Sequence, residues 1–514
     1  MKKLLKNPSS WLWLTIVFYF VTHLKGLALL PVFADEAIYI RWAQLIIDDW
    51  QQYLFFPLND GKTPLFIWLL SLGQKVSFLG VLHVSRLLSV IIGALQVIVG
   101  VKIIQTLKGE KTAQIIGALS FTFLPFWFFY HRMALMDGLL VLWLSVSWWL
   151  LMSLKNKKGD MKQMVFSGLA FGMALWTKLP ALLFIPALGF APLLLGFKKK
   201  DFALKTSWAA GSVLIGLVVF LLLKIHPAFG QLFNRGNDFL YPIHELLETG
   251  VFNVLWRNTK LAISVLGNYL TWPVLLLPFA GFFQPQRRRH GLLMLSALGF
   301  MGAILLLGKT VHPRYLLPAA LPLTVSAALV LERFSLHTQK LLKRPLSMLI
   351  RSAALVVMLT IIASSVTQFV LISWQNPDYL PLIPQDKEQY LTEWSSGHGI
   401  EEVTSLIIST SVNQTIAVAT EGYFGTLPDG ILMYLHRQNV QNIMVEGIGQ
   451  PVISISGEFI EKAEGYDRVW LVVNSHRQEM NLEQQPKAVL LAEYPRPAGG
   501  PSLQVWDITR LLRN

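Results

Sequence analysis

The sequence contains no cysteine, so disulfide bonds and thiolate chemistry are excluded. Charged residues are scarce as well, at 14% of the chain against about a quarter in soluble proteins. The sequence also lacks internal repeats, low-complexity tracts, metal-ligand spacings, a P-loop and a glycine-rich dinucleotide fingerprint. Hydrophobic residues, in contrast, make up 53% of the 514 positions. This composition indicates an integral membrane protein with no recognisable nucleotide or metal motif.

The formal net charge of +14 would suggest a nucleic-acid partner in a soluble protein. Here most lysines and arginines lie in short loops between apolar stretches, where basic residues set the orientation of membrane helices. We therefore expect no nucleic-acid partner. The basic residues concentrate in every second loop, which predicts a cytoplasmic N-terminus and cytoplasmic loops at 108–111, 155–162, 198–205, 287–289 and 333–351.

Apolar stretches near the length of a membrane helix, about 20 residues, predict about eleven spans. The first follows a basic start and lacks a small-residue cleavage site, so we expect an uncleaved signal-anchor. The remaining loops and everything after residue 373 are then expected outside the cytoplasm. The expected spans are residues 11–31, 85–107, 112–130, 138–154, 163–177, 179–196, 206–225, 262–283, 291–308, 315–332 and 350–372.

Two domains are predicted, a transmembrane domain over 1–374 and an extracytoplasmic soluble domain over 375–514. The first domain includes an outer loop, 32–84, with an amphipathic interfacial helix expected at 37–50 and a re-entrant or interfacial segment at 64–78. The second shows strand patterns alternating with helix patterns, which favours a small α/β domain. Its strands are expected at 415–420, 469–473, 489–492 and 503–507, with helices from Ile400 and over 430–436. The predicted fold class is mainly α, polytopic, with a small external α/β domain.

An acidic pair, Asp35-Glu36, follows the first apolar stretch. A solvated helix terminus would explain one such pair. A general base with an orienting or metal-binding carboxylate is the functional alternative, because an external carboxylate can take the proton of an attacking hydroxyl. The neighbouring charge would raise the basicity of that carboxylate.

Cationic residues occur at the same predicted outer side. Lys62 lies in a tight turn between Gly61 and Pro64, where it could snorkel to lipid head groups or bind a substrate phosphate. Arg314 begins a span after His312 and can bind phosphate through two hydrogen bonds, although an interface anchor is the commoner role.

Lys178 is a similar candidate at another span end. Asp137 begins a span after a short turn that contains Arg132. A structural ion pair between Arg132 and Asp137 and a catalytic role for Asp137 as a second acid both stay open. Carboxylates facing cations at one depth of a membrane protein suggest a site for an anionic substrate.

These segments together resemble a known superfamily. Asp35-Glu36, the stretch Gly-Lys-Thr-Pro-Leu-Phe-Ile-Trp at 61–68, Arg-Met-Ala-Leu-Met-Asp-Gly at 132–138 and His-Pro-Arg-Tyr at 312–315 are similar to the GT-C glycosyltransferases. The similarity covers about residues 10–370. It is narrowest to the protein O-mannosyltransferase (family 39) and aminoarabinose-transferase branch.

The resemblance implies an integral-membrane glycosyltransferase that moves a sugar from a polyprenyl-phosphate carrier to an extracytoplasmic protein, lipid or glycan. It further implies that Asp35 is the catalytic base and that Lys62 contacts the donor phosphate. Two departures bear on the acceptor: Thr63 follows Lys62 where many relatives have proline, and the C-terminal segment is unlike the domains appended to eukaryotic mannosyltransferases.

The predicted catalytic residues are therefore Asp35, Glu36 and Asp137, and the predicted donor-phosphate ligands are Lys62, Arg314, His312 and Lys178. No cofactor is required by this interpretation, and a divalent metal is left open. The alternative is a secondary transporter or flippase of an anionic or lipid-linked substrate. Transporters usually carry their charges near the membrane midplane on broken helices and often contain inverted repeats, which the sequence does not show.

Overall fold

The computed structural model describes residues 10–77, 79–154, 160–196, 199–340, 345–436, 438 and 442–513. Parts of the basic loops that predict orientation, including Lys2, Lys3, Lys6, Lys155 and Lys157, lie outside these residues. The chain divides into two compact units. The first comprises Met1–Leu27, Phe55–Phe66 and Leu87–Gln375, and the second comprises Ala28–Leu54, Ile67–Arg86 and Asn376–Asn514.

The packing boundary after Gln375 lies one residue from the predicted domain boundary. The second unit also includes most of the outer loop that we expected in the transmembrane domain. Two of the boundaries between the units fall inside helices, one in α4 (Leu65–Val76) and one in α5 (Val81–Thr106). The expected functional division at 374/375 stays a prediction.

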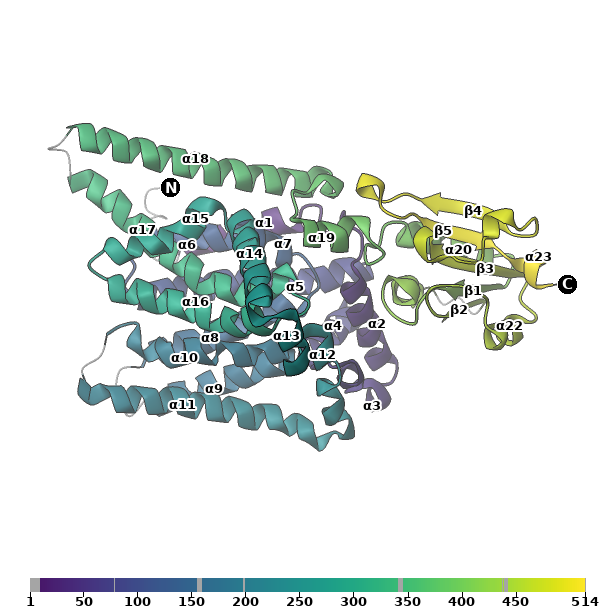
Figure 1. The fold of residues 1–514 in the computed structure, drawn as a ribbon, viewed down its shortest axis with the longest axis horizontal. Helices are drawn as coiled ribbons and strands as arrows, with labels where there is room; N and C mark the ends of the chain where they lie inside the picture. The colour runs from purple at the N-terminus through teal and green to yellow at the C-terminus, as the bar shows by residue number, and fades with distance from the viewer. Residues whose placement is uncertain are drawn as a thin grey trace. The chain divides into compact units, whose positions relative to one another are not determined.

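The first unit is built almost entirely of helices (Figure 1). In this unit α8 packs on α9, α9 packs on α11 and α16 packs on α17. The main helices besides α5 are α1 (Ser10–Leu24), α6 (Lys111–Phe123), α7 (Pro125–Tyr130), α8 (Met136–Met152), α9 (Asp160–Thr177), α10 (Ile185–Phe190), α11 (Lys199–Leu221), α12 (Gly236–Phe239), α13 (Ile243–Thr249), α14 (Val251–Tyr269), α15 (Trp272–Ala280), α16 (Arg287–Leu307), α17 (Leu317–Lys340) and α18 (Pro345–Gln375).

Fewer helices than expected are long enough to cross a membrane by themselves. In the described part of the chain, five have the length and composition of a span, and a bent pair brings the number to six. The five are Val81–Thr106, Asp201–Ile225, Arg287–Leu307, Pro313–Phe334 and Leu355–Gln375. Helix length and composition alone therefore support five or six of the about eleven spans that we expected.

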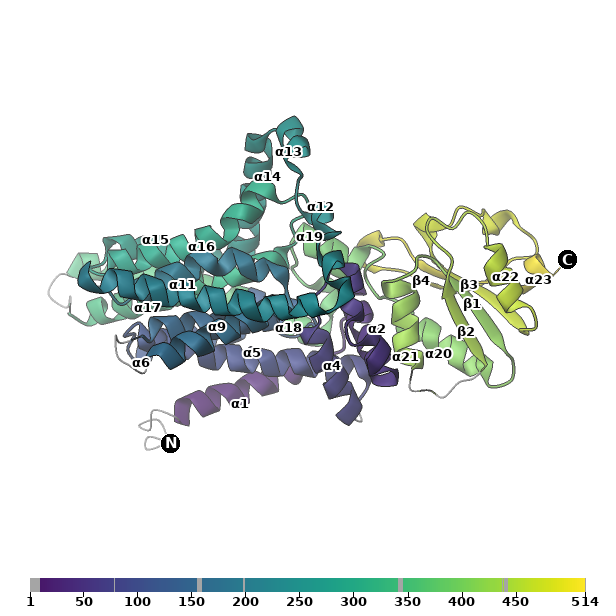
Figure 2. The same cartoon turned by 90° about the horizontal axis from the view of Figure 1, so that it is seen from below.

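Proline accounts for several of the differences, because it lacks an amide hydrogen and clashes with the preceding turn. The expected span 112–130 is divided into α6 and α7 before Pro125. The expected span 179–196 is divided into short 3₁₀ and α-helical pieces, each with a proline at its start. The expected span 262–283 is bent by 105° between α14 and α15, where Thr271 has a φ of 68°. Figure 2 shows α13 and the start of α14 projecting from the other helices of this unit.

The second unit contains a five-stranded mixed sheet in the order β2-β1-β3-β5-β4. Three strands run parallel and β3, β5 and β4 pair antiparallel. The strands are β1 (Ile416–Thr420), β2 (Ile443–Gly447), β3 (Arg468–Asn474), β4 (Val489–Tyr494) and β5 (Leu503–Asp507). The helices are α2 (Ala34–Asp48), α3 (Trp50–Tyr53), α19 (Pro384–Lys387), α20 (Ile400–Ser411), α21 (Ile431–Leu435), α22 (Gly457–Ala463) and α23 (Thr509–Leu512). The predicted α/β fold of the C-terminal segment is confirmed.

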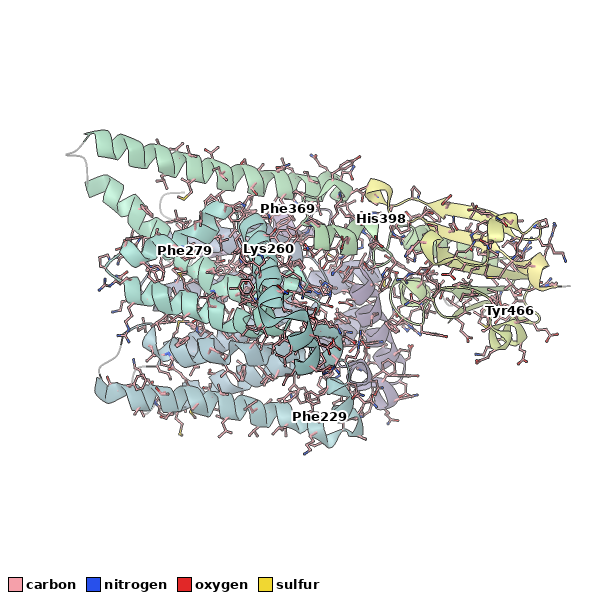
Figure 3. The ribbon with its side chains drawn as sticks, viewed as in Figure 1. Phe229, Lys260, Phe279, Phe369, His398 and Tyr466 are labelled. Atoms are coloured by element: carbon pink, nitrogen blue, oxygen red, sulfur yellow. The ribbon has the colours of Figure 1, made fainter. Side chains whose placement is uncertain are left out.

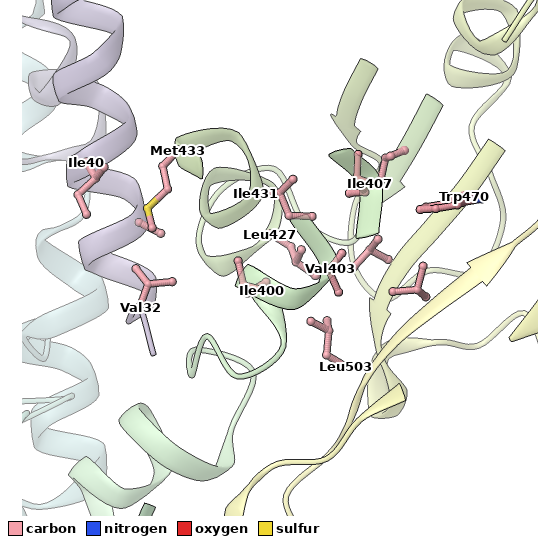
Figure 4. Close-up of a cluster of buried hydrophobic side chains, with 14 of the residues drawn as sticks. Val32, Ile40, Ile400, Val403, Ile407, Leu427, Ile431, Met433, Trp470 and Leu503 are labelled. Atoms are coloured by element: carbon pink, nitrogen blue, oxygen red, sulfur yellow. The ribbon is translucent and has the colours of Figure 1, made fainter. Parts of the chain in front are cut away.

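Helix α2 differs from the interfacial helix that we expected at 37–50. Ala37 and Ile40 are fully buried in a hydrophobic cluster with Ile431 and Met433 of the C-terminal segment (Figure 4). The Gln44 amide also donates to the carbonyl of Met433 at 2.9 Å. The apolar face of α2 is therefore covered by protein, which fixes the helix that carries the acidic pair.

Candidate functional site

The acidic pair lies in the first turn of α2, where the helix dipole favours carboxylates. The helix begins after Phe33, whose backbone N–H donates to Glu36 Oε2 at 3.0 Å. The backbone N–H of Ala34 donates to the carbonyl of Ser395, which ties this turn to the C-terminal segment. Asp35 is partly exposed, whereas Glu36 is fully buried. The two adjacent acids therefore have different environments.

Glu36 forms a buried ion pair with Arg86. Arg86 Nε lies 2.9 Å from Oε1 and Nη2 lies 2.7 Å from Oε2, a two-pronged contact that suits the planar guanidinium. The guanidinium also donates to the carbonyls of Leu30 and Pro31. The side chains are 1% and 0% exposed. This arrangement favours an anchoring role for Glu36 and leaves Asp35 as the partly exposed acid of the pair.

Arg86 is not among the functional residues that the sequence predicts. An ionisable side chain near the start of a long apolar helix usually needs a partner, and that rule could have marked Arg86 as important. Its partner lies 50 positions away, however, and only folding brings the two together.

A second charged group joins three predicted residues of the first unit. Asp137 lies in the first turn of α8, Lys178 follows α9 and Arg314 precedes α17. Lys178 Nζ lies 2.8 Å from Asp137 Oδ1, and Arg314 Nε lies 4.0 Å from Asp137 Oδ2. Asp137 is 3% exposed and Arg314 is 6% exposed. One carboxylate therefore holds two cations in place.

Tyr315 lies beside this group. Lys178 Nζ is 4.5 Å from the centroid of the Tyr315 ring, and the Arg314 guanidinium carbon is 5.7 Å from it. The ring of His312 meets the same tyrosine edge-on, with centroids 5.2 Å apart. An aromatic face attracts cations, so Tyr315 helps to keep both near Asp137.

Lys62 lies in the turn that the sequence predicts. Gly61 ends a short 3₁₀ helix (Phe56–Asp60) with a φ of 70°, a conformation that glycine adopts without strain. Lys62 Nζ is 2.5 Å from Asp60 Oδ2, and Arg235 Nη1 is 2.6 Å from Asp60 Oδ1. This carboxylate also holds two cations, and only Lys62 of the two is predicted from the sequence.

Contacts of aromatic rings connect the two cationic groups. The Arg235 guanidinium carbon lies 5.8 Å from the centroid of the Phe239 ring. That ring lies 6.4 Å from the ring of Tyr315, which faces Lys178. Lys62, Arg235, Lys178 and Arg314 therefore belong to one connected set of side chains in the first unit. We call these four residues the cationic set.

Arg132, which we weighed as an ion partner of Asp137, makes backbone contacts elsewhere. Its guanidinium donates to the carbonyls of Lys25 and Gly26 at 2.8 and 2.7 Å and to the hydroxyl of Ser373. These bonds tie the turn before α8 to the ends of α1 and α18. Arg132 therefore has a structural role.

A loop of the C-terminal segment packs on α2 and carries a buried acid. Asp429 accepts a hydrogen bond from the backbone N–H of Gly425 at 2.8 Å. Burial raises the pKa of Asp429 to about 6, against the opposing effects of that N–H and of the Arg41 charge on α2. The protonation state of Asp429 is therefore expected to change at mildly acidic pH.

Across the described residues, no three His, Asp or Glu side chains gather in a way that could hold a metal ion. Glu36, Asp60 and Asp137 are each paired with lysine or arginine. The geometry of the Asp60 and Asp137 groups suits an anionic ligand that would share their cations.

Comparison with known proteins agrees with the predicted resemblance. Residues 61–224, about a third of the chain, match the family described as dolichyl-phosphate-mannose-protein mannosyltransferase. This segment includes Lys62, Asp137 and Lys178. A comparison with curated proteins finds no match.

Solved structures show the same fold over nearly the whole chain. ArnT from Cupriavidus metallidurans bound to undecaprenyl phosphate has a TM-score of 0.62 at 14% identity, covering 98% of each chain. The oligosaccharyltransferase AglB from Archaeoglobus fulgidus, in complex with an inhibitory peptide and a dolichol-phosphate, has a TM-score of 0.53 at 14% identity. That match covers 91% of this chain and 69% of AglB. The predicted GT-C fold is confirmed, and the chain is a multi-pass membrane protein.

Proposed function

Starting from the GT-C fold, we propose that this chain transfers a sugar from a polyprenyl phosphate to an acceptor outside the cytoplasm. The cationic set is the observation that carries the proposal. In this set Asp60 pairs with Lys62 and Arg235, Asp137 pairs with Lys178 and Arg314, and ring contacts of Phe239 and Tyr315 link the two pairs. A polyprenyl-phosphate sugar offers a phosphate to such a set, together with a lipid tail that a membrane protein can accommodate.

In the proposed reaction the donor phosphate binds at Lys62, Lys178 and Arg314, with His312 at the edge of the group. When the bond between the anomeric carbon and the phosphate oxygen breaks, that oxygen keeps the electron pair. Positive groups fixed in advance stabilise the charge that develops there. Asp60 and Asp137 act as positioning residues, because each holds a pair of cations.

Asp35 is the proposed general base. The acceptor hydroxyl oxygen forms the new bond to the anomeric carbon, and its proton passes to the Asp35 carboxylate. Glu36 and Arg86 are proposed to hold the first turn of α2 so that Asp35 stays at a fixed position. The partial exposure of Asp35 and the burial of Glu36 support this division of roles.

The acceptor is proposed to be a protein, lipid or glycan on the outer side of the membrane. The alternation of basic loops in the sequence supports a cytoplasmic N-terminus and an extracytoplasmic C-terminal domain. The undecaprenyl phosphate in ArnT and the dolichol-phosphate in AglB are the carriers that motivate the donor class.

Product analysis tests the proposal. Purified protein would be incubated with labelled polyprenyl-phosphate sugars and a panel of envelope acceptors, and products would be identified by mass spectrometry. Transfer of label to an acceptor, with release of polyprenyl phosphate, is the expected result. Net movement of intact donor across a vesicle membrane, with its sugar–phosphate bond unbroken, would instead show a transporter or flippase.

A further inference from the structure

A cavity of about 720 Å³ lies at one end of the C-terminal sheet, away from the acidic helix. It is formed where β1 and β3 begin and where β5 ends. The opposite end of β1 leads into the loop that packs on α2. The cavity is lined by Asn413, Gln414, Asp467, Arg468, Lys487, Thr509, Arg510 and Arg513.

The lining is strongly cationic, with four basic side chains and one carboxylate. The carboxylate, Asp467, is already engaged by hydrogen bonds from the backbone N–H and hydroxyl of Thr415 at 2.8 and 3.1 Å. These bonds hold the pKa of Asp467 below its usual value, so the group stays ionised. Even with Asp507, which pairs with Arg468 just outside the lining, two carboxylates balance only part of the charge of four basic side chains.

Two of the arginines are held in position by neighbouring groups. Arg468 Nε donates to Gln414 Oε1 at 2.9 Å, and Nη1 lies 3.2 Å from Asp507 Oδ2. The Arg513 guanidinium donates to the carbonyls of Tyr466 and Asp467, and Figure 3 labels Tyr466 in this part of the domain. Guanidinium groups fixed in this way lose less conformational entropy when an anion binds.

We infer that this cavity binds a phosphorylated ligand that carries more than one negative charge. Basic surface residues usually serve only solubility, and scattered ones would need no ligand. Here the cations converge on one cavity, and two of them are fixed by hydrogen bonds. The volume leaves room for a phosphate and part of an attached group, such as a sugar. The inference does not depend on the proposed transferase activity.

Binding of inorganic pyrophosphate to the purified full chain tests the inference by isothermal titration calorimetry. The wild-type protein is expected to bind saturably. The double variant Arg468→Gln/Arg510→Gln is expected to bind at least tenfold more weakly, because charge-assisted hydrogen bonds are lost. Lys462→Gln is the matched control, because Lys462 is an exposed cation of the same domain that pairs with Glu446 and Glu458 outside the cavity.

Three results would overturn the inference: wild-type protein that does not bind pyrophosphate, an unaffected double variant, or an equal loss in Lys462→Gln. If the double variant unfolds, the single variant Arg510→Gln provides the same comparison, because Arg510 is exposed.

Competition then separates two sources of the phosphate. Displacement of pyrophosphate by glucose 1-phosphate would indicate a soluble phosphorylated glycan. Displacement only by vesicles that contain cardiolipin, whose head group carries two phosphates, and not by phosphatidylcholine vesicles, would indicate a lipid head group. Displacement by neither would contradict the ligand class.

Discussion

Lys178 and Asp137 are 41 positions apart in the chain, yet Lys178 Nζ lies 2.8 Å from Asp137 Oδ1. The same carboxylate lies 4.0 Å from Arg314 on its other oxygen. Asp137 is buried and Lys178 is partly buried, so their attraction is screened less than that of a surface ion pair. In the proposed reaction, this contact would hold Lys178 and Arg314 beside one carboxylate before the donor phosphate binds.

If the pair acts as a unit, its two single variants and the double variant should behave alike. We expect Lys178→Met to lower kcat/KM for the donor by about 10- to 100-fold, the scale of a lost charge-assisted hydrogen bond. Asp137→Asn should cause a comparable loss, because Lys178 and Arg314 lose their common anchor. Steady-state kinetics with varied donor would measure the three variants. Losses that simply multiply in the double variant would show that the two residues act independently.

Lys62 offers a direct test of phosphate binding. Lys62→Ala should lower kcat/KM for the donor by about 10- to 100-fold, and Lys62→Arg should recover part of the loss because the charge returns. Lys75→Ala is the control, since Lys75 is an exposed lysine at the end of α4 that could anchor to lipid head groups. Equal and small effects of Lys62→Ala and Lys75→Ala would assign Lys62 to membrane anchoring.

Asp35 should be required for chemistry rather than for folding. Asp35→Asn keeps the shape of the side chain and removes its basicity, so turnover should fall by about 10²-fold or more with donor binding largely retained. Asp49→Asn serves as the control, because Asp49 is an exposed carboxylate just after the same helix. Near-normal transfer by a folded Asp35→Asn protein would rule out the proposed base.

Glu36 and Arg86 should be required for stability. Removing either partner leaves a buried charge without its counter-ion, which typically costs about 3–5 kcal/mol. Glu36→Gln and Arg86→Met are each expected to lower the thermal unfolding temperature clearly, whereas the double variant should recover part of the loss. Thermal unfolding in detergent would measure the unfolding temperatures of the three variants and of the wild type. Single variants as stable as the wild type would contradict a structural ion pair.

The raised pKa of Asp429 predicts that the stability of the second unit depends on pH. Because the folded pKa is raised to about 6, the folded state holds a proton that the unfolded state releases near pH 4. The stability contribution of this group is therefore present below about pH 4, declines as the pH rises and is lost above about pH 6. Relative to wild type, Asp429→Asn should gain unfolding free energy on the order of 2 kcal/mol between pH 4 and pH 7. Chemical unfolding at several pH values would measure it. A difference that does not change with pH would mean that Asp429 is ionised throughout.

The sequence by itself determined the membrane class, the positions of the charged residues at the ends of apolar stretches and most of the C-terminal strands. These are local properties. The strand over 416–420 matches an unbroken apolar run, whereas β2 and α22 were not predicted. β2 has only three apolar residues in a row before Glu446 and Gly447, a run too short to indicate a strand from sequence.

Only the tertiary structure decided which charges are partners. Arg86 meets Glu36, Asp60 holds both Lys62 and Arg235, and Lys178 reaches Asp137, and in most of these contacts the partners come from distant segments. It also decided where apolar stretches are broken into shorter helices and that α2 is covered by the C-terminal segment. A sequence pattern shows which residues favour a helix or an interface, but a buried charge takes its partner from whichever segment packs against it. That choice depends on packing across the whole fold.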